Sequence, residues 1–311
     1  MKWRKQERLE GGLKKRGVWT QKSDPDHPLV SIITVCLNSA KYIEETIQSV
    51  LNQTYSNIEY IIVDGGSRDG TLGIIRRYED RIAYWISEPD RGIYDAMNKG
   101  VSLATGELVG IINSDDWYFP DAVMMVVEAY KTHPEVDVIF GNLMLLERKE
   151  KGLIFRESKI KMDDVFKNFT FNHPTCFVSR RVYQKDRFNL RYKIAADYEL
   201  MLRLYLKKSR FFYLNKCIAC FRIGSVSYSY RKIIEYYQIV KRYASYKEAL
   251  YVWCLDTLPY LELKINNFKV RLLKALFGGN KENPLLRFYR RWLKKRLSLP
   301  RFLSNLLHVE R

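Results

Sequence analysis

Residues 30–64 read VSIITVCLNSAKYIEETIQSVLNQTYSNIEYIIVD, and this stretch decides the fold. Two runs rich in Val and Ile, at 30–37 and 58–64, are typical of strands buried in a sheet. Between them Ile43, Ile47 and Val50 recur at helical spacing. The stretch therefore predicts strand, helix and strand in succession, which is the unit that builds parallel sheets.

The same alternation continues towards the C-terminus. It predicts helices at 71–78, 92–103 and 122–132, and strands at 83–88, 108–113 and 136–142. Such a chain forms an α/β fold, with a mostly parallel central sheet and helices on both faces. Ligands of these sheets bind beyond the carboxyl ends of the strands.

Polar and acidic residues follow four of the predicted strands. They are Asn38, Asp64, Asp90 and the pair Asp115–Asp116. Because carboxyl ends of parallel strands meet at one edge of a sheet, we expect the chemistry at this edge.

After residue 140 the alternation changes. The pattern predicts a hairpin over 143–160 with its turn at 150–152, a helix at 196–206 and a strand at 210–215. From residue 230 it is helical and basic, with a break at 278–284 and a basic amphipathic helix after it. The predicted divisions are a basic extension at 1–27, a catalytic domain at 28–228 with halves 28–118 and 119–228, and a helical basic region at 229–311.

The positive charge lies at the two ends of the chain. The net charge is +18, made up of +6 over 1–22, −5 over 23–206 and +17 over 207–311. No run is apolar enough to span a bilayer, so we expect basic ends that bind an anionic membrane surface. Nucleic acid is the other anionic partner to consider, but it leaves the acids at the strand ends unexplained.

The first residues and the cysteines indicate a protein that stays in the cytoplasm. The N-terminus is basic without the apolar segment of a secretory signal, so we expect no export. The five cysteines are widely spread and are expected to be reduced. Cys217 and Cys220 lack a second pair at zinc spacing, which favours a structural role.

The Asp115–Asp116 pair is the sharpest local signal. Two carboxylates directly after an apolar strand can hold Mg²⁺ or Mn²⁺, which accept few protein oxygens and complete their shell with phosphates. Alternatively, the pair caps the helix that follows or lies solvated in a turn.

Three ordered stretches carry a family resemblance: VSIITVCLN, IEYIIVDGGSRDGT and GIYDAMNKGVSLATGELVGIINSDDWY. Together they resemble the family 2 glycosyltransferases of GT-A fold, especially those that build bacterial O-antigens, capsules and exopolysaccharides. The resemblance covers about residues 29–225. It implies metal-dependent, inverting transfer of a sugar from a nucleotide diphosphate sugar, with UDP favoured.

The resemblance assigns the central roles to three aspartates. Asp116 is the expected metal ligand, Asp115 reaches ribose or metal, and Asp197 is the base that accepts the proton of the incoming hydroxyl. Asp197 could instead cap its own helix, in which Glu199 and Arg203 are spaced to pair.

The resemblance also marks nucleotide-sugar contacts. These are Thr34, Asp64, Asp69, Arg91, Asp95, Asn98, Lys99, Asp115 and Arg222, with His173 near the acceptor or the diphosphate. The chain departs from the family at Gly65, where many members have an acid that contacts the base. For Asp95, an ion pair with Lys99 is the structural alternative.

The expected activity is therefore transfer of one hexose or N-acetylhexosamine to a lipid-linked polysaccharide intermediate. The expected acceptor, a saccharide on polyprenyl diphosphate, also comes from the resemblance and places the enzyme on the inner face of the cell membrane. A nucleotidyltransferase with a similar sheet and a basic nucleic-acid-binding protein are the alternatives.

Overall fold

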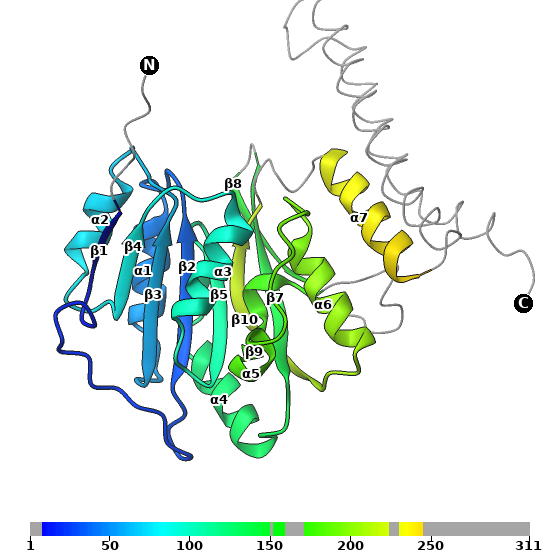
Figure 1. Cartoon of the computed structure of the whole chain (residues 1–311), viewed down its shortest axis with the longest axis horizontal. Helices are drawn as coiled ribbons and strands as arrows, with labels where there is room; N and C mark the ends of the chain where they lie inside the picture. The colour runs from blue at the N-terminus through cyan, green and yellow to red at the C-terminus, as the bar shows by residue number, and fades with distance from the viewer. Residues whose placement is uncertain (1–7, 150–151, 159–170, 224–229, 245–311) are drawn as a thin grey trace, which may run out of the picture. The chain divides into compact units, whose positions relative to one another are not determined.

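The computed structural model describes residues 8–149, 152–158, 171–223 and 230–244 (Figure 1). The chain divides into two compact units, Met1–Ala249 and Leu250–Arg311, and every described residue lies in the first. The predicted break at 278–284 and the amphipathic helix after it lie outside the described residues.

Four parallel strands form the centre of the sheet, in the order β4-β3-β2-β5. They are β2 (Val30–Cys36), β3 (Ile58–Asp64), β4 (Tyr84–Ser87) and β5 (Leu108–Asn113). These segments match the predicted strands, and β2 and β3 are buried along almost their whole length. Central strands covered on both faces read as continuous apolar runs, which is why the sequence pattern located them.

Shorter strands and a hairpin extend the sheet on both sides. In the described part of the chain the strand order is β1-β4-β3-β2-β5-β9-β7-β10-β6, with β8 paired to β7. The added strands are β1 (Leu9–Gly11), β6 (Trp117–Tyr118), β7 (Val138–Lys149), β8 (Gly152–Ser158), β9 (Phe177–Ser179) and β10 (Phe211–Arg222). The β7–β8 hairpin is antiparallel, as predicted. β1, β6 and β9 have two or three residues each, too few for a periodic signal.

Helices cover both faces of the sheet (Figure 1). They are α1 (Ile43–Leu51), α2 (Thr71–Arg77), α3 (Ile93–Leu103), α4 (Ala122–Thr132), α5 (Arg180–Tyr183), α6 (Ala196–Leu206) and α7 (Tyr230–Tyr243), with a 3₁₀ turn at His173–Thr175. Apolar side chains of α1, α2 and α4 join one cluster with Ile32 and Ile62. On the opposite face α3 packs so closely that a Cβ on Gly100 would lie 2.4 Å from Ile33 Cγ2. Ile32 and Ile33 point to opposite faces because side chains alternate along a strand.

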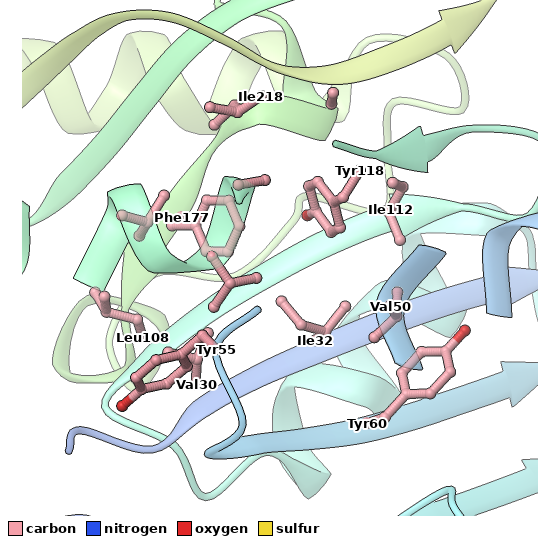
Figure 2. Close-up of a cluster of buried hydrophobic side chains, with 14 of the residues drawn as sticks. Val30, Ile32, Val50, Tyr55, Tyr60, Leu108, Ile112, Tyr118, Phe177 and Ile218 are labelled. Carbon is pink, nitrogen blue, oxygen red and sulfur yellow. The ribbon is translucent and has the colours of Figure 1, made fainter. Parts of the chain in front are cut away.

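The main apolar core lies between the sheet and the first of these helix layers. Figure 2 shows Ile32 of β2, Tyr60 of β3 and Val50 of α1 facing one another, and all three are at most 2% exposed. This core fixes the central strands, and through them the loops that follow their carboxyl ends.

Part of the predicted N-terminal extension belongs to the sheet. β1 pairs antiparallel with β4, and Lys14 forms an ion pair with the fully buried Glu59 of β3. The sequence pattern placed residues 1–27 outside the catalytic domain because three strand residues among many charges give no periodicity.

α7 is likewise tied to the catalytic domain. The predicted boundary at 228–229 assigned it to the C-terminal region, whereas the first compact unit extends to Ala249. Ile233, Ile239 and Val240 of α7 are buried, and the Tyr198 and Tyr236 rings stack with centroids 4.5 Å apart. Among the described residues, no helix is both long and apolar enough to cross a membrane.

Candidate active site

The Asp115–Asp116 pair lies in the turn that leaves β5. The Asp116 side chain is fully buried, and its Oδ1 accepts a hydrogen bond from the backbone N–H of Arg222 at 3.0 Å. Its Oδ2 accepts one from Asn113 Nδ2 at 3.2 Å, and its carbonyl oxygen accepts one from Thr46 Oγ1 at 2.7 Å. Contacts from three separate segments therefore fix Asp116. The pair does not cap α4, which begins after Asp121 without a side-chain cap.

The electrostatics of the pair favour a bound cation. Burial raises the pKa of Asp116 well above its usual range, and the adjacent Asp115 charge adds to the effect. Burial also raises the pKa of Asp115. Neither carboxylate forms an ion pair with any described residue, and the buried Asn113 Oδ1 has no hydrogen-bond partner. A divalent cation would compensate this charge, so the residues present suit Mg²⁺ or Mn²⁺.

These two carboxylates would have to be the main protein ligands of such a cation. The described residues contain no group of three or more His, Cys, Asp and Glu side chains that could hold a metal. Mg²⁺ is usually bound through one or two carboxylates and the phosphates of the substrate. The donor set is therefore of the kind that phosphate oxygens of a ligand can complete.

Arg222 reaches this turn from the end of β10. Its guanidinium lies over the rings of Tyr42 and Trp117, at 4.4 and 5.2 Å from their centroids, and pairs with Glu45 Oε2 at 2.8 Å. Its Nε donates to the carbonyl oxygen of Asp115 at 3.3 Å. The antiparallel pairing of β10 with β6 explains this proximity over more than a hundred residues of chain.

The predicted contacts at the first strand ends separate into two groups. Asp64 and Asp69 shape the loop after β3: the fully buried Asp64 accepts from Ser87 Oγ at 2.6 Å and from the Ser67 N–H at 2.9 Å. Asp69 accepts from the Ala40 N–H at 3.0 Å. Thr34 instead lies inside the sheet, fully buried, with its hydroxyl 3.0 Å from the Tyr60 hydroxyl.

Gly65 lies against the Asp90 side chain, which would have to move to admit a side chain at residue 65. A Cβ at this position would lie 2.5 Å from Asp90 Oδ2, closer than real Cβ contacts. The loop after β4 therefore places the Asp90 carboxylate where a side chain of residue 65 would begin.

The predicted site residues around the start of α3 differ in their contacts: some form ion pairs and one binds the backbone of another segment. Asp95 pairs with Arg91 at 3.0 Å, and Lys99 pairs with Glu88 at 3.0 Å, so the suggested Asp95–Lys99 pair does not form. Asn98 makes two hydrogen bonds with the backbone of Phe188, at 2.9 and 3.0 Å, and so holds a neighbouring segment.

Asp197 lies in the first turn of α6 and does not cap that helix. The helix begins after Ala195 with no side-chain cap, and Glu199 pairs with Arg203 at 3.1 Å, as its spacing suggested. The Tyr94 hydroxyl lies 2.8 Å from Asp197 Oδ1 and 2.7 Å from the carbonyl oxygen of Ile194. Burial raises the pKa of Tyr94 well above its usual range, and the Asp197 charge raises it further, so the hydroxyl remains a donor.

His173 belongs to the same neighbourhood. Burial lowers its pKa, which favours the neutral ring, and the negative charge of Asp197 acts in the opposite direction. The structure thus forms two groups: Asp115, Asp116 and Arg222 around the end of β5, and Asp197 and His173 around the start of α6.

Several contributing residues escaped the sequence analysis. Tyr94, Tyr42, Glu45 and Asn113 touch the predicted acids or Arg222. Their only signal is sequence proximity: Asn113 begins the NSDD run, and Tyr94 stands within RGIYDAMNKG. Glu45 and Tyr42 face Arg222 through tertiary contacts that no local pattern encodes.

Comparison with known proteins decides the family. The sequence profile described as "Glycosyl transferase family 2" matches residues 31–188. The chain belongs to glycosyl transferase family 2. Its similarity to an uncharacterized glycosyltransferase of Mycobacterium tuberculosis (strain CDC 1551 / Oshkosh) is 35% identity over 182 residues, covering 57% of this chain and 68% of the relative.

A second relative carries a pathway name. The PGL/p-HBAD biosynthesis glycosyltransferase of Mycobacterium bovis (strain BCG / Pasteur 1173P2) is 29% identical over 184 residues, covering 57% of this chain and 70% of that protein.

Two solved structures share the fold of this family 2 glycosyltransferase. S. aureus TarS 1–349 in complex with UDP-GlcNAc aligns with a TM-score of 0.58 at 17% identity, covering 84% of this chain and 79% of that one. The mannosyltransferase PcManGT from Pyrobaculum calidifontis in complex with GDP-Man and Mn²⁺ aligns with a TM-score of 0.58 at 19% identity, covering 94% and 91%. At these identities the likeness shows the fold alone, which is the GT-A type predicted from the sequence.

Proposed function

We propose that this glycosyltransferase moves a single sugar from a nucleotide diphosphate sugar to a saccharide hydroxyl with inversion at the anomeric carbon. The observation that carries the proposal is the Asp115–Asp116 pair at the end of β5: Asp116 is fully buried, and neither carboxylate forms an ion pair with a described residue. Such a pair suits a metal-bound diphosphate better than a purely structural role.

Asp115 and Asp116 would hold Mn²⁺ or Mg²⁺. When bound, the cation neutralises the negative charge that develops on the departing diphosphate. The complex of PcManGT with GDP-Man and Mn²⁺ supports a metal of this kind in the shared fold. Arg222 lies beside the pair and can supply a guanidinium to phosphate oxygens. To bind phosphate, Arg222 would have to leave its ion pair with Glu45, whose side chain is exposed to solvent.

Asp197 is the proposed base. An acceptor hydroxyl attacks the anomeric carbon while the bond from that carbon to the diphosphate oxygen breaks, and the hydroxyl proton passes to the Asp197 carboxylate. A single displacement of this kind inverts the configuration. The hydrogen bond from Tyr94 orients the carboxylate, and the neutral form favoured for His173 adds no competing positive charge.

The donor is proposed to be a UDP-hexose or UDP-N-acetylhexosamine. The loop shaped by Asp64 and Asp69, together with Arg91, Asp95 and Lys99 around the start of α3, would border the nucleotide sugar. Thr34 and Asn98 are better explained as structural, because their side chains are engaged inside the fold. The UDP-GlcNAc complex of TarS supports UDP as the nucleotide of the donor. The GDP-Man complex of PcManGT makes GDP the nucleotide to test against UDP.

The acceptor is proposed to be a saccharide on polyprenyl diphosphate, used in surface-polysaccharide assembly such as that of O-antigen or capsule. The relative named as a PGL/p-HBAD biosynthesis glycosyltransferase supports a role in a biosynthetic pathway. The net charge of +17 over residues 207–311 supports peripheral binding to the anionic inner face of the cell membrane.

The proposal is tested by incubating the full chain and a saccharide acceptor on polyprenyl diphosphate with UDP-glucose, UDP-galactose, UDP-GlcNAc or GDP-mannose and measuring release of the nucleotide. Each donor is assayed with Mn²⁺, with Mg²⁺ and with a chelator. Metal-dependent release from a UDP-sugar supports the proposal. Release that persists in chelator contradicts the metal role, and release from none of the donors contradicts the donor assignment.

A further inference from the structure

The segment before α6 is held by a carboxylate from α7. Glu235, which is only 5% exposed, accepts hydrogen bonds from three successive backbone N–H groups. Its oxygens lie 2.9 Å from the Lys193 nitrogen, 2.8 Å from that of Ile194 and 3.0 Å from that of Ala195. A buried carboxylate with this many donors forms charge-assisted bonds, which are stronger than neutral ones.

α6 needs this help because it has no cap of its own. Its N-cap residue is Ala195, and no side chain of the segment caps the helix. Negative charge is favourable at a helix N-terminus, where backbone N–H groups lack partners within the helix. Glu235 therefore supplies from α7, forty residues later in the chain, what a local Ser or Asp usually provides.

The same segment also leads to the proposed base. The carbonyl oxygen of Ile194 and Asp197 Oδ1 both lie within hydrogen-bond distance of the Tyr94 hydroxyl. A shift of the 193–195 backbone would move the carbonyl oxygen of Ile194, which competes with Asp197 for the Tyr94 hydroxyl proton. It would also move the first turn of α6, which carries Asp197. Glu235, the 193–195 backbone, Tyr94 and Asp197 thus form one connected set of hydrogen bonds.

Other contacts keep α7 in place for this task. Tyr236 stacks on Tyr198 of α6, and the Tyr243 hydroxyl donates to Glu199 Oε1. Arg231 pairs with Glu235 at 3.2 Å, which balances the buried charge. α7 therefore contacts α6 through two pairs of side chains. In addition, Glu235 binds the backbone of 193–195, which precedes the uncapped start of α6.

From this geometry we infer that Glu235 is a positioning residue for catalysis, which sets the orientation of Asp197 through the 193–195 backbone. The inference rests on the proposed function, in which Asp197 is the base. It predicts that loss of the Glu235 carboxylate lowers turnover while leaving donor binding intact, because the Asp115–Asp116 pair is held by other contacts.

The test compares Glu235→Gln and Glu235→Asp with two controls. Gln keeps the size but turns an amide donor group towards backbone N–H donors, whereas Asp keeps the charge on a shorter side chain. Gln238→Ala changes an exposed residue of the same helix, and Lys14→Met removes an ion pair remote from this segment. Nucleotide release from the preferred donor of the unaltered chain, donor affinity and the midpoint of thermal unfolding are measured for each.

We expect kcat of Glu235→Gln to fall about 10- to 100-fold with donor affinity unchanged, as for a misplaced catalytic group. Glu235→Asp should recover part of this loss, Gln238→Ala should match the unaltered chain, and Lys14→Met should lose stability without losing kcat. Hydrogen exchange of the Ile194 and Ala195 amides should be slow in the unaltered chain and faster in Glu235→Gln.

Two outcomes overturn the inference, and they can be told apart. If the unaltered chain is active and Glu235→Gln keeps its kcat, or loses kcat only in proportion to donor affinity, the positioning role is wrong and the proposed function stands. If the unaltered chain turns over none of the donors, the proposed function fails and the inference fails with it.

Discussion

Two fully buried aspartates follow β3 and β5, the two strands that flank β2, and their partners distinguish them. Asp64 accepts hydrogen bonds from Ser87 and from the Ser67 and Gly66 backbone, so its charge is satisfied within the loop that it shapes. Within the described part of the chain, Asn113 and the Arg222 backbone are the only donors to the Asp116 carboxylate, and a second carboxylate lies beside it. The contrast indicates a structural Asp64 and an Asp116 suited to a cation.

Asp116→Asn is therefore expected to abolish the Mn²⁺ dependence of nucleotide binding. Removing one buried negative charge also relieves the repulsion from Asp115, so the variant should be at least as stable as the unaltered chain. Titration of UDP with and without Mn²⁺, followed by the fluorescence of the adjacent Trp117, measures the first effect. An Asn variant that keeps the full Mn²⁺ enhancement would rule out Asp116 as a ligand.

Asp197→Asn is expected to leave nucleotide affinity unchanged and to lower turnover by about 10²- to 10⁴-fold, the usual contribution of a general base. Tyr94→Phe removes only the orienting hydrogen bond, so its loss of turnover should be smaller. Steady-state nucleotide release measures both variants. Equal turnover in Asp197→Asn and in the unaltered chain would show that the base lies elsewhere.

Among the elements, β1 and the turn after it are held to the sheet by an ion pair between the partly exposed Lys14 and a buried carboxylate. Glu59 of β3 is fully buried and accepts hydrogen bonds from Lys14, from Ser31 and from Thr105, the last through its N–H at 2.7 Å. Burial acts to raise the pKa of Glu59, but these hydrogen bonds outweigh it and the pKa is lowered from 4.5.

Because the pKa of Glu59 is lowered on folding, its ionised form contributes stability above about pH 4.5, and the contribution is lost as the pH falls through the lower, folded-state pKa. Lys14→Met leaves the buried carboxylate without its cation and is expected to cost about 3 kcal/mol at pH 7. The difference between variant and unaltered chain should shrink as the pH falls towards the lowered folded-state pKa of Glu59, because protonation of the carboxyl group removes the charge that Lys14 pairs with. Urea unfolding at pH 7 and near pH 3.5 checks this, and a difference independent of pH would contradict it.

The elements also show what a single sequence can reveal. Strands β2, β3 and β5 follow continuous apolar runs, and helices α3 and α4 follow runs of helical period, so the pattern located them within a few residues. β6 and β9 are too short for a period, and their pairings are set by tertiary contacts. The sequence pattern could therefore place Asp116 and Asp197 at the ends of elements. It could not predict the hydrogen bonds from the start of α6 to Glu235, because these depend on the tertiary fold.

At the scale of the whole molecule, the charge is divided between an acidic body and basic ends. The net charge is −5 over residues 23–206 and +17 over 207–311. Each Lys or Arg near an anionic bilayer contributes about 1 kcal/mol of attraction, and salt screens it. The full chain should therefore sediment with vesicles that contain phosphatidylglycerol, stay in solution beside neutral vesicles, and be released by high salt. Equal sedimentation with both kinds of vesicle would contradict an electrostatic attachment.

Calorimetry measures directly whether the end of β5 forms a metal-dependent nucleotide site. The full chain is titrated with UDP, GDP, CMP and dTDP, each in Mn²⁺ and in chelator. UDP is expected to bind most tightly, and chelator is expected to weaken this binding at least about tenfold, a free-energy difference of about 1.4 kcal/mol. Binding that is unaffected by chelator, or no binding of any of these nucleotides, would contradict this expectation.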